Sequence, residues 1–363
     1  MSKYFKPLFT ALVASALIFS LAACNNDGSA TTSASEPASS SDTSSPSSDN
    51  GSAAADSPEY TFTVSVDASE EEAIYKYAVN LKEEIEARSN GRMKVDVYGN
   101  AALGGDEEAL QSCADGIITF TICTTAPQVS FMPEMAMFDL PNLFDNIQQF
   151  RALFTDEEFY GTLQGIYNNN GYQLMGVADS GFRVMSSNKK IESLADFNGI
   201  KIRTMKNNNH IEIWKSLGAN PTPMSFSEVY IGLQQGTIVA QENPVEVITA
   251  AKFYEQQKYI INTNHLPHAS CLIMSKTVYD GLSADDKAIV DEAAAAASTY
   301  ARNMVDKLNT EQLATIQDYG VEIVDLPAEV LDAMREAEKP VYELIKDQIG
   351  DDLYDLMLRA SGN

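Results

Sequence analysis

The chain has 363 residues, of which 51 are acidic and 25 basic, and its formal net charge at pH 7 is −26. This acidity excludes nucleic acid as a partner and argues against docking on anionic lipid, because both need a cationic surface. A binding site for an anion would therefore depend on a few cations placed where the ligand lies. The part after residue 58 is longer than a usual single core and predicts two domains.

The N-terminus predicts export and a lipid anchor. Lys3 and Lys6 precede an apolar run over residues 8–21, which closes on Leu21-Ala22-Ala23-Cys24. The run is shorter than the ~20 residues of a membrane-spanning helix. We therefore expect residues 1–24 to be a lipoprotein signal peptide, with lipid on the thiol of Cys24 and the protein held at the outer face of the cytoplasmic membrane or in the periplasm. The alternative is an ordinary signal peptide, or a short anchor, with an incidental cysteine.

Residues 25–58 contain no apolar side chain larger than alanine. Such a segment cannot bury enough surface to offset its ordering entropy, so we expect a disordered tether rich in Ser, Ala and Thr. The three later cysteines, Cys113, Cys123 and Cys271, are too few for a disulfide framework. A bridge between Cys113 and Cys123 stays open, although buried free thiols are favoured.

The remaining chain alternates between strand and helix patterns. Residues 60–67 alternate in strand fashion, and Ser69 with Glu72 has the form of a capping box that opens a helix ending near Gly91. The later expectations, in chain order, are a strand at 93–98, a helix at 107–114, a strand at 117–123, helices within 146–168, strands at 172–178 and 200–204, and a helix at 209–217. This alternation predicts an α/β chain with mainly parallel sheets.

A long helix is expected in the C-terminal third. Ser283 and Asp286 form a capping pair, and no Gly or Pro follows until Gly320. Some 35 helical residues span ~50 Å, which is more than the width of one small domain. We therefore expect this helix to bridge both domains.

Signatures of enzymes and cofactors are absent from the sequence. It has no phosphate loop, dinucleotide glycine fingerprint, serine elbow or HExxH motif. His265 and His268 are spaced to share a metal, but Pro267 between them favours a loop, and no third ligand is near. We expect neither a metal nor a cofactor.

Two arginines are candidate anion-binding residues. Arg203 lies at the carboxyl end of the predicted strand 200–204, and the carboxyl ends of parallel strands face the ligand crevice in α/β folds. Arg183 follows the strand at 172–178 and a predicted Ser180-Gly181 turn. A guanidinium in either place can hold a carboxylate in a bidentate grip. The alternative is a surface arginine paired with one of the many acids.

Three further side chains are weaker candidates on their own. Asn243 precedes Pro244 in a segment typical of turns, where an asparagine usually bonds its own backbone. Phe226 can form the wall of a pocket, although a phenylalanine near a helix start is more often part of the core. Trp214 falls on the apolar side of its helix and is interpreted as a core residue.

Several ordered motifs together resemble one family, the extracytoplasmic solute-binding proteins of tripartite ATP-independent periplasmic (TRAP) transporters, of the DctP type. Each motif is weak alone, but their order and spacing over almost the whole folded part are specific. They are PEMAMFDLP at 133–141, GFR at 181–183, DFNGIKIR at 196–203, LGANPTP at 217–223, EVY at 228–230, QENP at 241–244 and TNH at 263–265.

The resemblance implies a two-lobed α/β fold, like that of type II periplasmic binding proteins, with a long interdomain helix. Residues 59–180 with 269–308 would form the first lobe, and residues 181–268 with 309–363 the second. The chain would then be no enzyme. It would be a receptor that binds a small organic acid between the lobes and delivers it to TRAP membrane permease subunits.

The resemblance also assigns roles to residues. Arg203 of the Lys-x-Arg motif would hold the substrate carboxylate, with Arg183 assisting and Asn243 lining the site. Phe226 would pack on the ligand. The first lobe would contribute Asp67 at the end of its first strand and the segment up to Thr125, and His265 of the Thr-Asn-His motif is a further candidate for ligand binding.

The chain departs from the family pattern at two places. Val239-Ala240 replaces the usual Asp-Gly before the QENP motif, and Asn142 replaces a Phe after Pro141. Neither change removes an arginine, but both leave the identity of the acid open. Two other functions also stay open, namely an extracellular ligand-sensing or adhesion lipoprotein without a permease, and a secreted hydrolase with an unrecognised nucleophile.

Overall fold

The computed structural model describes residues 57–362. The predicted signal peptide, the tether and the lipidation site Cys24 lie outside these residues. None of the helices described is long and apolar enough to cross a bilayer.

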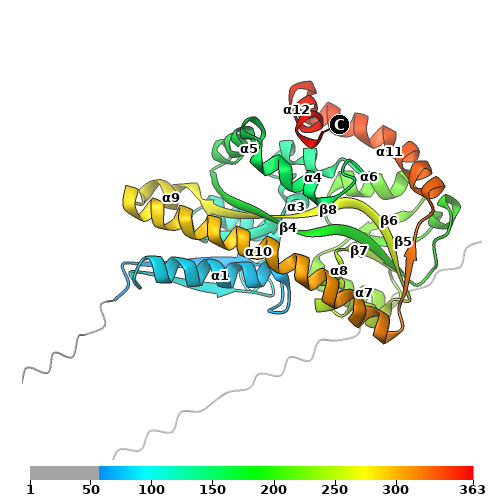
Figure 1. Ribbon diagram of the computed structural model, residues 1–363, viewed down its shortest axis with the longest axis horizontal. Helices are drawn as coiled ribbons and strands as arrows, with labels where there is room; N and C mark the ends of the chain where they lie inside the picture. The colour runs from blue at the N-terminus through cyan, green and yellow to red at the C-terminus, as the bar shows by residue number, and fades with distance from the viewer. Residues whose placement is uncertain (1–56, 363) are drawn as a thin grey trace, which may run out of the picture. The chain divides into compact units, whose positions relative to one another are not determined.

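One mixed sheet of nine strands forms the centre of the described part (Figure 1). Its order is β2-β1-β3-β8-β4-β7-β5-β6, and β9 pairs with β8. The strands are β1 (Tyr60–Val66), β2 (Met93–Tyr98), β3 (Phe120–Thr124), β4 (Tyr172–Ser187), β5 (Lys201–Thr204), β6 (Asn220–Pro223), β7 (Ala240–Asn243), β8 (Tyr259–Ser275) and β9 (Glu322–Asp325).

Strand direction changes along the sheet. The outer strands run parallel, β2-β1-β3 at one end and β7-β5-β6 at the other, whereas β4 and β8 are antiparallel to each other and to their neighbours β7 and β3. The long strands β4 and β8 cross from one half of the sheet to the other. The prediction of an α/β fold with two lobes is confirmed, and the two crossing strands join the lobes.

The crossing strands correct two expectations about loops. β4 does not end at a Ser180-Gly181 turn, because Gly181, with φ of +82°, takes up a register shift between Asp179 and Phe182 and the strand continues. Arg183 therefore lies inside β4. His265 and His268 lie inside β8, where Pro267 is accommodated opposite Phe182.

Helices cover both faces of this sheet. They are α1 (Ala73–Arg88), α2 (Asp106–Ala114), α3 (Thr125–Gln128), α4 (Ile147–Ala152), α5 (Glu157–Asn169), α6 (Asn208–Ser216), α7 (Val229–Gln234), α8 (Val245–Ala250), α9 (Lys276–Gly281), α10 (Ala284–Tyr319), α11 (Ala328–Ile349) and α12 (Asp351–Ser361), with 3-10 turns η1 (Pro133–Asp139), η2 (Leu153–Thr155), η3 (Leu194–Phe197), η4 (Phe226–Glu228) and η5 (Phe253–Gln256).

Alternate residues of the crossing strands enter different hydrophobic cores. In the first lobe, Cys271 and Ile273 of β8 join a core with α5 and η1, whereas Leu272 and Met274 join a core with α1 and α10. In the second lobe, Ile260 and Ile261 divide in the same way between two further cores. Because both faces are covered, β4 and β8 are buried over most of their length. Their middle parts carry buried polar side chains, among them Asp179, Arg183 and His265.

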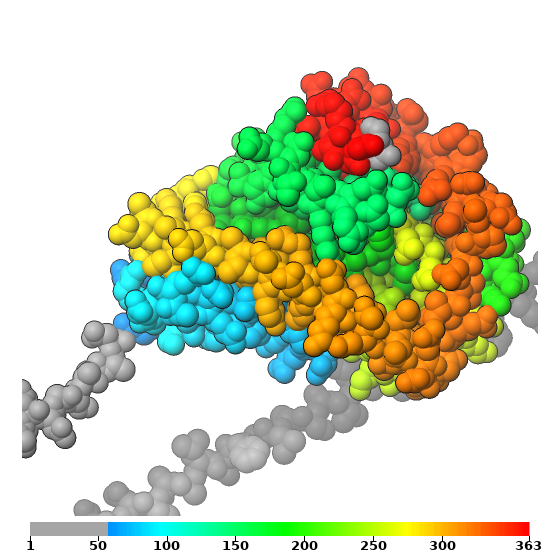
Figure 2. All heavy atoms as spheres, in the orientation of Figure 1, coloured from blue at the N-terminus to red at the C-terminus, as the bar shows by residue number. Residues whose placement is uncertain are grey.

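The long helix α10 confirms its prediction. Ser283 accepts a hydrogen bond from the backbone N–H of Asp286, and Gly320 ends the helix with φ of +100°. Its first half packs in the first lobe through Val290 and Ala297, and Ile316 near its end packs in the second lobe. In Figure 2 its atoms form an orange band that runs across the visible face of the folded part.

α11 also contacts both lobes. Val330 and Met334 lie in a core of the second lobe, whereas Val341 and Ile345 pack against the first. The lobe boundaries inferred from the family resemblance stay a prediction.

Two local expectations have different outcomes. Cys113, Cys123 and Cys271 are buried free thiols, as favoured. The helix expected from Ser69 begins four residues later, at Ala73, because Glu72 folds back and accepts hydrogen bonds from the backbone N–H and hydroxyl of Ser69. The capping-box residues therefore form a turn before α1.

Candidate functional site

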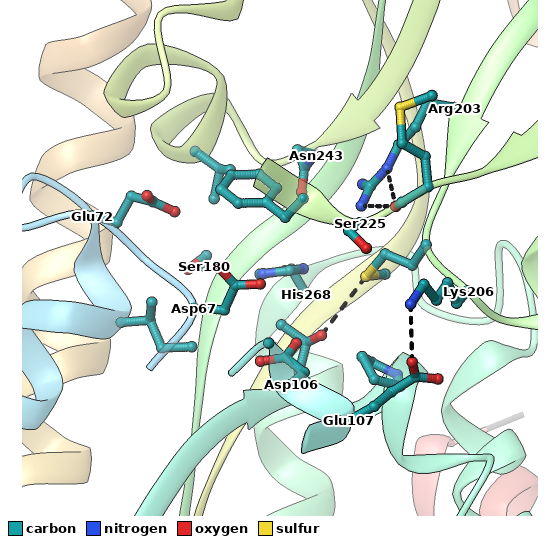
Figure 3. A pocket seen from close by; sticks show the side chains of 18 of the residues that line it. Asp67, Glu72, Asp106, Glu107, Ser180, Arg203, Lys206, Ser225, Asn243 and His268 are labelled. Carbon is teal, nitrogen blue, oxygen red and sulfur yellow. Dashed lines mark hydrogen bonds and ion pairs between the residues drawn. The ribbon is translucent and has the colours of Figure 1, made fainter. Parts of the chain in front are cut away.

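A pocket lies between the lobes, with β4 and β8 between its two sides (Figure 3). The loop after β1, the start of α1 and α2 form one side. β5, η4, β7 and α8 form the other. The space between the lining atoms, including the part open to solvent, is about 810 Å³.

Arg203 lines this pocket from the second lobe. It lies in β5, between β6 and β7, and is only 2% exposed. Its Nε and Nη2 donate hydrogen bonds to the backbone oxygen of Met224, at 3.0 and 2.7 Å, whereas Nη1 has no partner. Burial lowers the pKa of Arg203 to about 10, so it stays charged at neutral pH. A buried guanidinium with a free N–H and no ion-pair partner among the described residues is suited to bind an anion.

Asn243 and Phe226 line the same pocket. Asn243 is the last residue of β7 and is buried, and its Nδ2 donates a hydrogen bond to Oε1 of Gln241 at 2.7 Å. Phe226 begins η4, is half-buried and meets the ring of Phe253 edge-on at 5.7 Å. The structure therefore brings a cation, an amide and an aromatic ring together at the second-lobe side.

Asp67 lies on the opposing side, directly after β1, and is one of six acidic side chains that line the pocket. Burial raises the pKa of Asp67, and Arg203 partly offsets this rise. The other five are Glu72, Asp106, Glu107, Glu108 and Glu246. Among the described lining residues, Arg203 and Lys206 are the lysine and arginine side chains. Burial raises the pKa of Glu72 to about 8, so this carboxyl is mostly uncharged at neutral pH, and burial raises the pKa of Asp106 well above its ordinary value.

Arg183 is completely buried but lies outside this pocket. Its guanidinium donates to both carboxylate oxygens of Glu242, to the Glu242 backbone oxygen and to Nδ1 of His268. Burial alone would raise the pKa of Glu242, but Arg183 and then His265 hold it well below its ordinary value. In this structure every nitrogen of Arg183 is therefore used within the protein.

His265 and Thr125 also lie outside the main pocket. The ring of His265 joins Oγ1 of Thr263 at 2.8 Å and Oε2 of Glu242 at 3.1 Å, and burial lowers its pKa. Thr125 is buried at the start of α3 and borders a small neighbouring cavity together with Arg183. Its neighbour Thr124 lines the main pocket in its place.

His268 is a lining residue that the sequence did not single out for ligand binding. Because Arg183 can only donate, Nδ1 of His268 must accept, and the neutral ring then carries its proton on Nε2. Burial and Arg183 both lower the pKa of His268 well below its ordinary value. The ring is thus fixed as a neutral hydrogen-bond donor beside the pocket (Figure 3).

Lys206 and Glu107 lie at the more exposed part of the pocket. Their ion pair, 3.2 Å long, joins the segment after β5 to α2 and so connects the two sides. Half-exposed pairs of this kind contribute about 1 kcal/mol or less. The pair can therefore open without a large cost when a ligand enters.

Several proteins similar to this chain are solute-binding proteins. A Verminephrobacter eiseniae solute-binding protein is 35% identical over 243 residues, which cover 67% of this chain and 72% of that protein. The 2,3-diketo-L-gulonate-binding periplasmic protein YiaO of Escherichia coli is 30% identical and covers 75% of this chain and 82% of its own. The sugar acid binding protein DctPAm of Advenella mimigardefordensis, solved with galactonate, superposes with a TM-score of 0.80 at 31% identity, over 83% of this chain and 97% of that one.

The family model agrees with these relatives. The model of the bacterial extracellular solute-binding proteins of family 7, DctP, matches residues 64–348, which include every strand except the first few residues of β1. The chain belongs to this DctP family of extracytoplasmic solute receptors of TRAP transporters.

Proposed function

We propose that the protein binds a small organic carboxylate in the pocket between its lobes, with Arg203 as the main partner of the carboxylate. Asn243 and Phe226 complete that side of the site. Binding encloses the ion pair between guanidinium and carboxylate, where low solvent access makes it costly to break.

The observation that carries this proposal is the free Nη1 of Arg203. The side chain of Arg203 is only 2% exposed and forms no ion pair with a described residue. Without a ligand, such a buried charge would destabilise the folded protein. The relatives support the same class of ligand, because DctPAm was solved with galactonate and YiaO binds diketogulonate, and both ligands are carboxylates.

The receptor would work at the outer face of the membrane. The sequence from Leu21 to Cys24 supports lipidation at Cys24, and residues 25–58 would tether the folded part to that lipid. The loaded receptor would then dock on the membrane subunits of a TRAP permease. The family's role in transport supports this step.

Calorimetry with a panel of organic acids tests the carboxylate site. Arg203→Ala should weaken binding of the best acid by about 3 kcal/mol or more, because removing one partner of a buried ion pair leaves the other charge unpaired. Arg335→Ala, at an exposed position on α11, should bind as the parent does. Unchanged affinity in Arg203→Ala would disprove the assignment.

Lipid anchoring has a separate test. In membranes of expressing cells, mass spectrometry of the mature N-terminus should find a diacylated Cys24. Cys24→Ala should release the folded receptor from the membrane without changing its affinity for the acid. Retention of Cys24→Ala at the membrane would rule out the lipid anchor.

A further inference from the structure

We propose that the ligand is a polyhydroxylated acid with a single carboxylate, which binds Arg203 by that carboxylate and the acidic side of the pocket by its hydroxyl groups. This inference rests on the proposed function, because it assumes that Arg203 binds the carboxylate. It specifies which chemical groups the ligand must carry in addition to its carboxylate.

The two sides of the pocket differ in what they offer. Figure 3 shows Arg203 and Asn243 on one side and Asp67, Asp106 and Glu72 toward the other, with Ser180 and His268 of the crossing strands between them. One end of the site therefore donates hydrogen bonds to an anion. The other end presents carboxyl oxygens, which need hydrogen-bond donors on the ligand.

The fold holds two of these carboxyl groups by one oxygen each. Oε1 of Glu72 accepts from the N–H and hydroxyl of Ser69, at 2.8 and 2.9 Å, and Oε2 of Glu246 accepts from the N–H of Ala73 at 3.3 Å. Both side chains are more than nine-tenths buried. Burial raises the pKa of Glu72 to about 8 and also raises that of Glu246. Glu72 is therefore a positioned, mostly protonated carboxyl at neutral pH, which can donate to or accept from a ligand hydroxyl.

Asp67 and Asp106 have no hydrogen-bond partner among the residues described. Burial raises the pKa of both, and neighbouring carboxylates raise it further, from Glu108 onto Asp67 and from Asp67 onto Asp106. A ligand hydroxyl would donate to such groups and relieve their desolvation. These two residues are therefore the strongest candidates for hydroxyl partners.

A second carboxylate at this end of the ligand would be repelled. It would meet Asp67, Glu107 and Glu108 with one nearby cation, Lys206, which is already paired with Glu107. Like charges brought together at an interface are strongly disfavoured. The site should therefore discriminate against dicarboxylates.

An ammonium group fits less well than several hydroxyls. The carboxyl groups come from the loop after β1, the start of α1, α2 and α8, and no three of them, among the residues described, are close enough to share one ion. A single point charge would thus reach few of them. Hydroxyls on successive carbons can meet the separated acceptors one by one.

Calorimetry of the full chain with matched acids tests this inference. The panel holds aldonates and uronates of about four to six carbons, with the dicarboxylate, the unsubstituted fatty acid and the omega-amino acid of each length. The best hydroxylated acid should bind about 100-fold more tightly than the dicarboxylate of the same length. A dicarboxylate or an amino acid that binds more tightly than every hydroxylated acid would overturn the inference.

Variants identify the acceptors. Asp67→Asn and Asp106→Asn keep the side-chain shape and should each weaken binding of the hydroxylated acid by about 10- to 100-fold, since each replaces one carboxyl oxygen by an amide NH2 that cannot accept a hydrogen bond. The double variant should also reduce the difference in affinity between the hydroxylated acid and the dicarboxylate. Glu70→Gln, exposed in the same loop as Glu72 but outside the pocket, is the control.

The outcomes separate the inference from the proposed function. If a dicarboxylate binds most tightly of the acids in the panel and Arg203→Ala abolishes its binding, the carboxylate site stands and the hydroxyl inference fails. If no acid binds, or Arg203→Ala has no effect, the proposed function itself fails. Unchanged affinity in both Asp variants, with native melting temperatures, would remove these residues from the site.

Discussion

At the scale of single residues, Arg203 and Arg183 are both buried, yet within residues 57–362 only Arg183 has a counter-ion at ion-pair distance. The charge of Arg183 is balanced by the carboxylate of Glu242. The guanidinium of Arg203 instead donates its described hydrogen bonds to the backbone oxygen of Met224. Removing the charge of Arg183 therefore breaks an ion pair within the protein, whereas removing the charge of Arg203 breaks no ion pair with a described residue. The two arginines should respond oppositely to mutation in the absence of ligand.

Arg203→Met should stabilise the empty protein while it abolishes binding. The change replaces an unpaired buried charge by an apolar chain of similar length, for which a gain of about 1–2 kcal/mol is expected. Thermal melting without ligand measures the gain. A clear loss of stability would show that Arg203 supports the fold rather than awaiting an anion.

Arg183→Ala should destabilise the empty protein by about 3–5 kcal/mol, because Glu242 would stay buried without its partner. Urea denaturation without ligand measures this loss. The double variant Arg183→Ala with Glu242→Gln should recover part of it. If Arg183→Ala melts like the parent but binds the acid weakly, its role is in the ligand site, as the family resemblance implies.

Glu338 should make stability depend on pH. It is fully buried in α11, and Asn142 donates to one oxygen at 2.6 Å while the other has no partner. Burial raises its pKa to about 7, so between about pH 4.5 and about 7 the folded state holds a proton that the unfolded chain has lost. The free energy of unfolding should therefore fall as pH rises through that window.

Glu338→Gln should remove this contribution and gain about 2–3 kcal/mol at about pH 8 relative to the parent. Urea denaturation at about pH 5 and about pH 8 measures the change. Glu336→Gln, an exposed neighbour on the same helix, is the control. Equal pH slopes in Glu338→Gln and the parent would contradict the account.

At the scale of elements, the long helix α10 is packed against β4 at a glycine. A Cβ at Gly176 would lie 2.1 Å from Oγ of Ser298 and 3.1 Å from the hydroxyl of Tyr77. Ser298 itself is fixed by a hydrogen bond to the backbone oxygen of Ala294, at 2.7 Å. The close approach of helix and strand thus depends on the missing side chain.

Gly176→Ala should cost about 1–3 kcal/mol of stability, as other overpacked cores do. Adding Ser298→Ala removes the nearest atom and leaves Cβ of residue 298 at 3.3 Å, so the double variant should recover most of the loss. Thermal melting of both variants checks this. If the double variant is no more stable than Gly176→Ala alone, the contact with Ser298 is not the cause.

Elements with strong local signals could be predicted, whereas long-range arrangements could not. The ends of α10 follow from Ser283 and Gly320, which act on their own neighbours. Arg183 needs Glu242 from β7 and His268 from β8, and neither pairing has a local signature. The acids of the pocket come from separate segments, although the run Asp106-Glu107-Glu108 after two glycines was a visible signal.

At the scale of the whole molecule, few direct contacts join the two sides of the pocket. The hydrogen bond from Ala73 N–H to Glu246 and the pair of Lys206 with Glu107 connect them at its edges. β4, β8 and α10 hold the lobes together elsewhere. Buried hydrogen bonds from Asn207 and Asn209 to Asp139 add to this connection. A ligand that bridges Arg203 and Asp67 would add a direct link between the two sides of the pocket.

The proposed site requires that an acid binds between the lobes with its carboxylate on Arg203. A crystal structure with the tightest-binding acid tests it most directly. We predict a carboxylate oxygen within about 3 Å of Nη1 of Arg203 and ligand hydroxyls at similar distances from Asp67 and Asp106. A carboxylate bound by Lys206 or Arg183 instead, with Nη1 of Arg203 still unpartnered, would contradict the account.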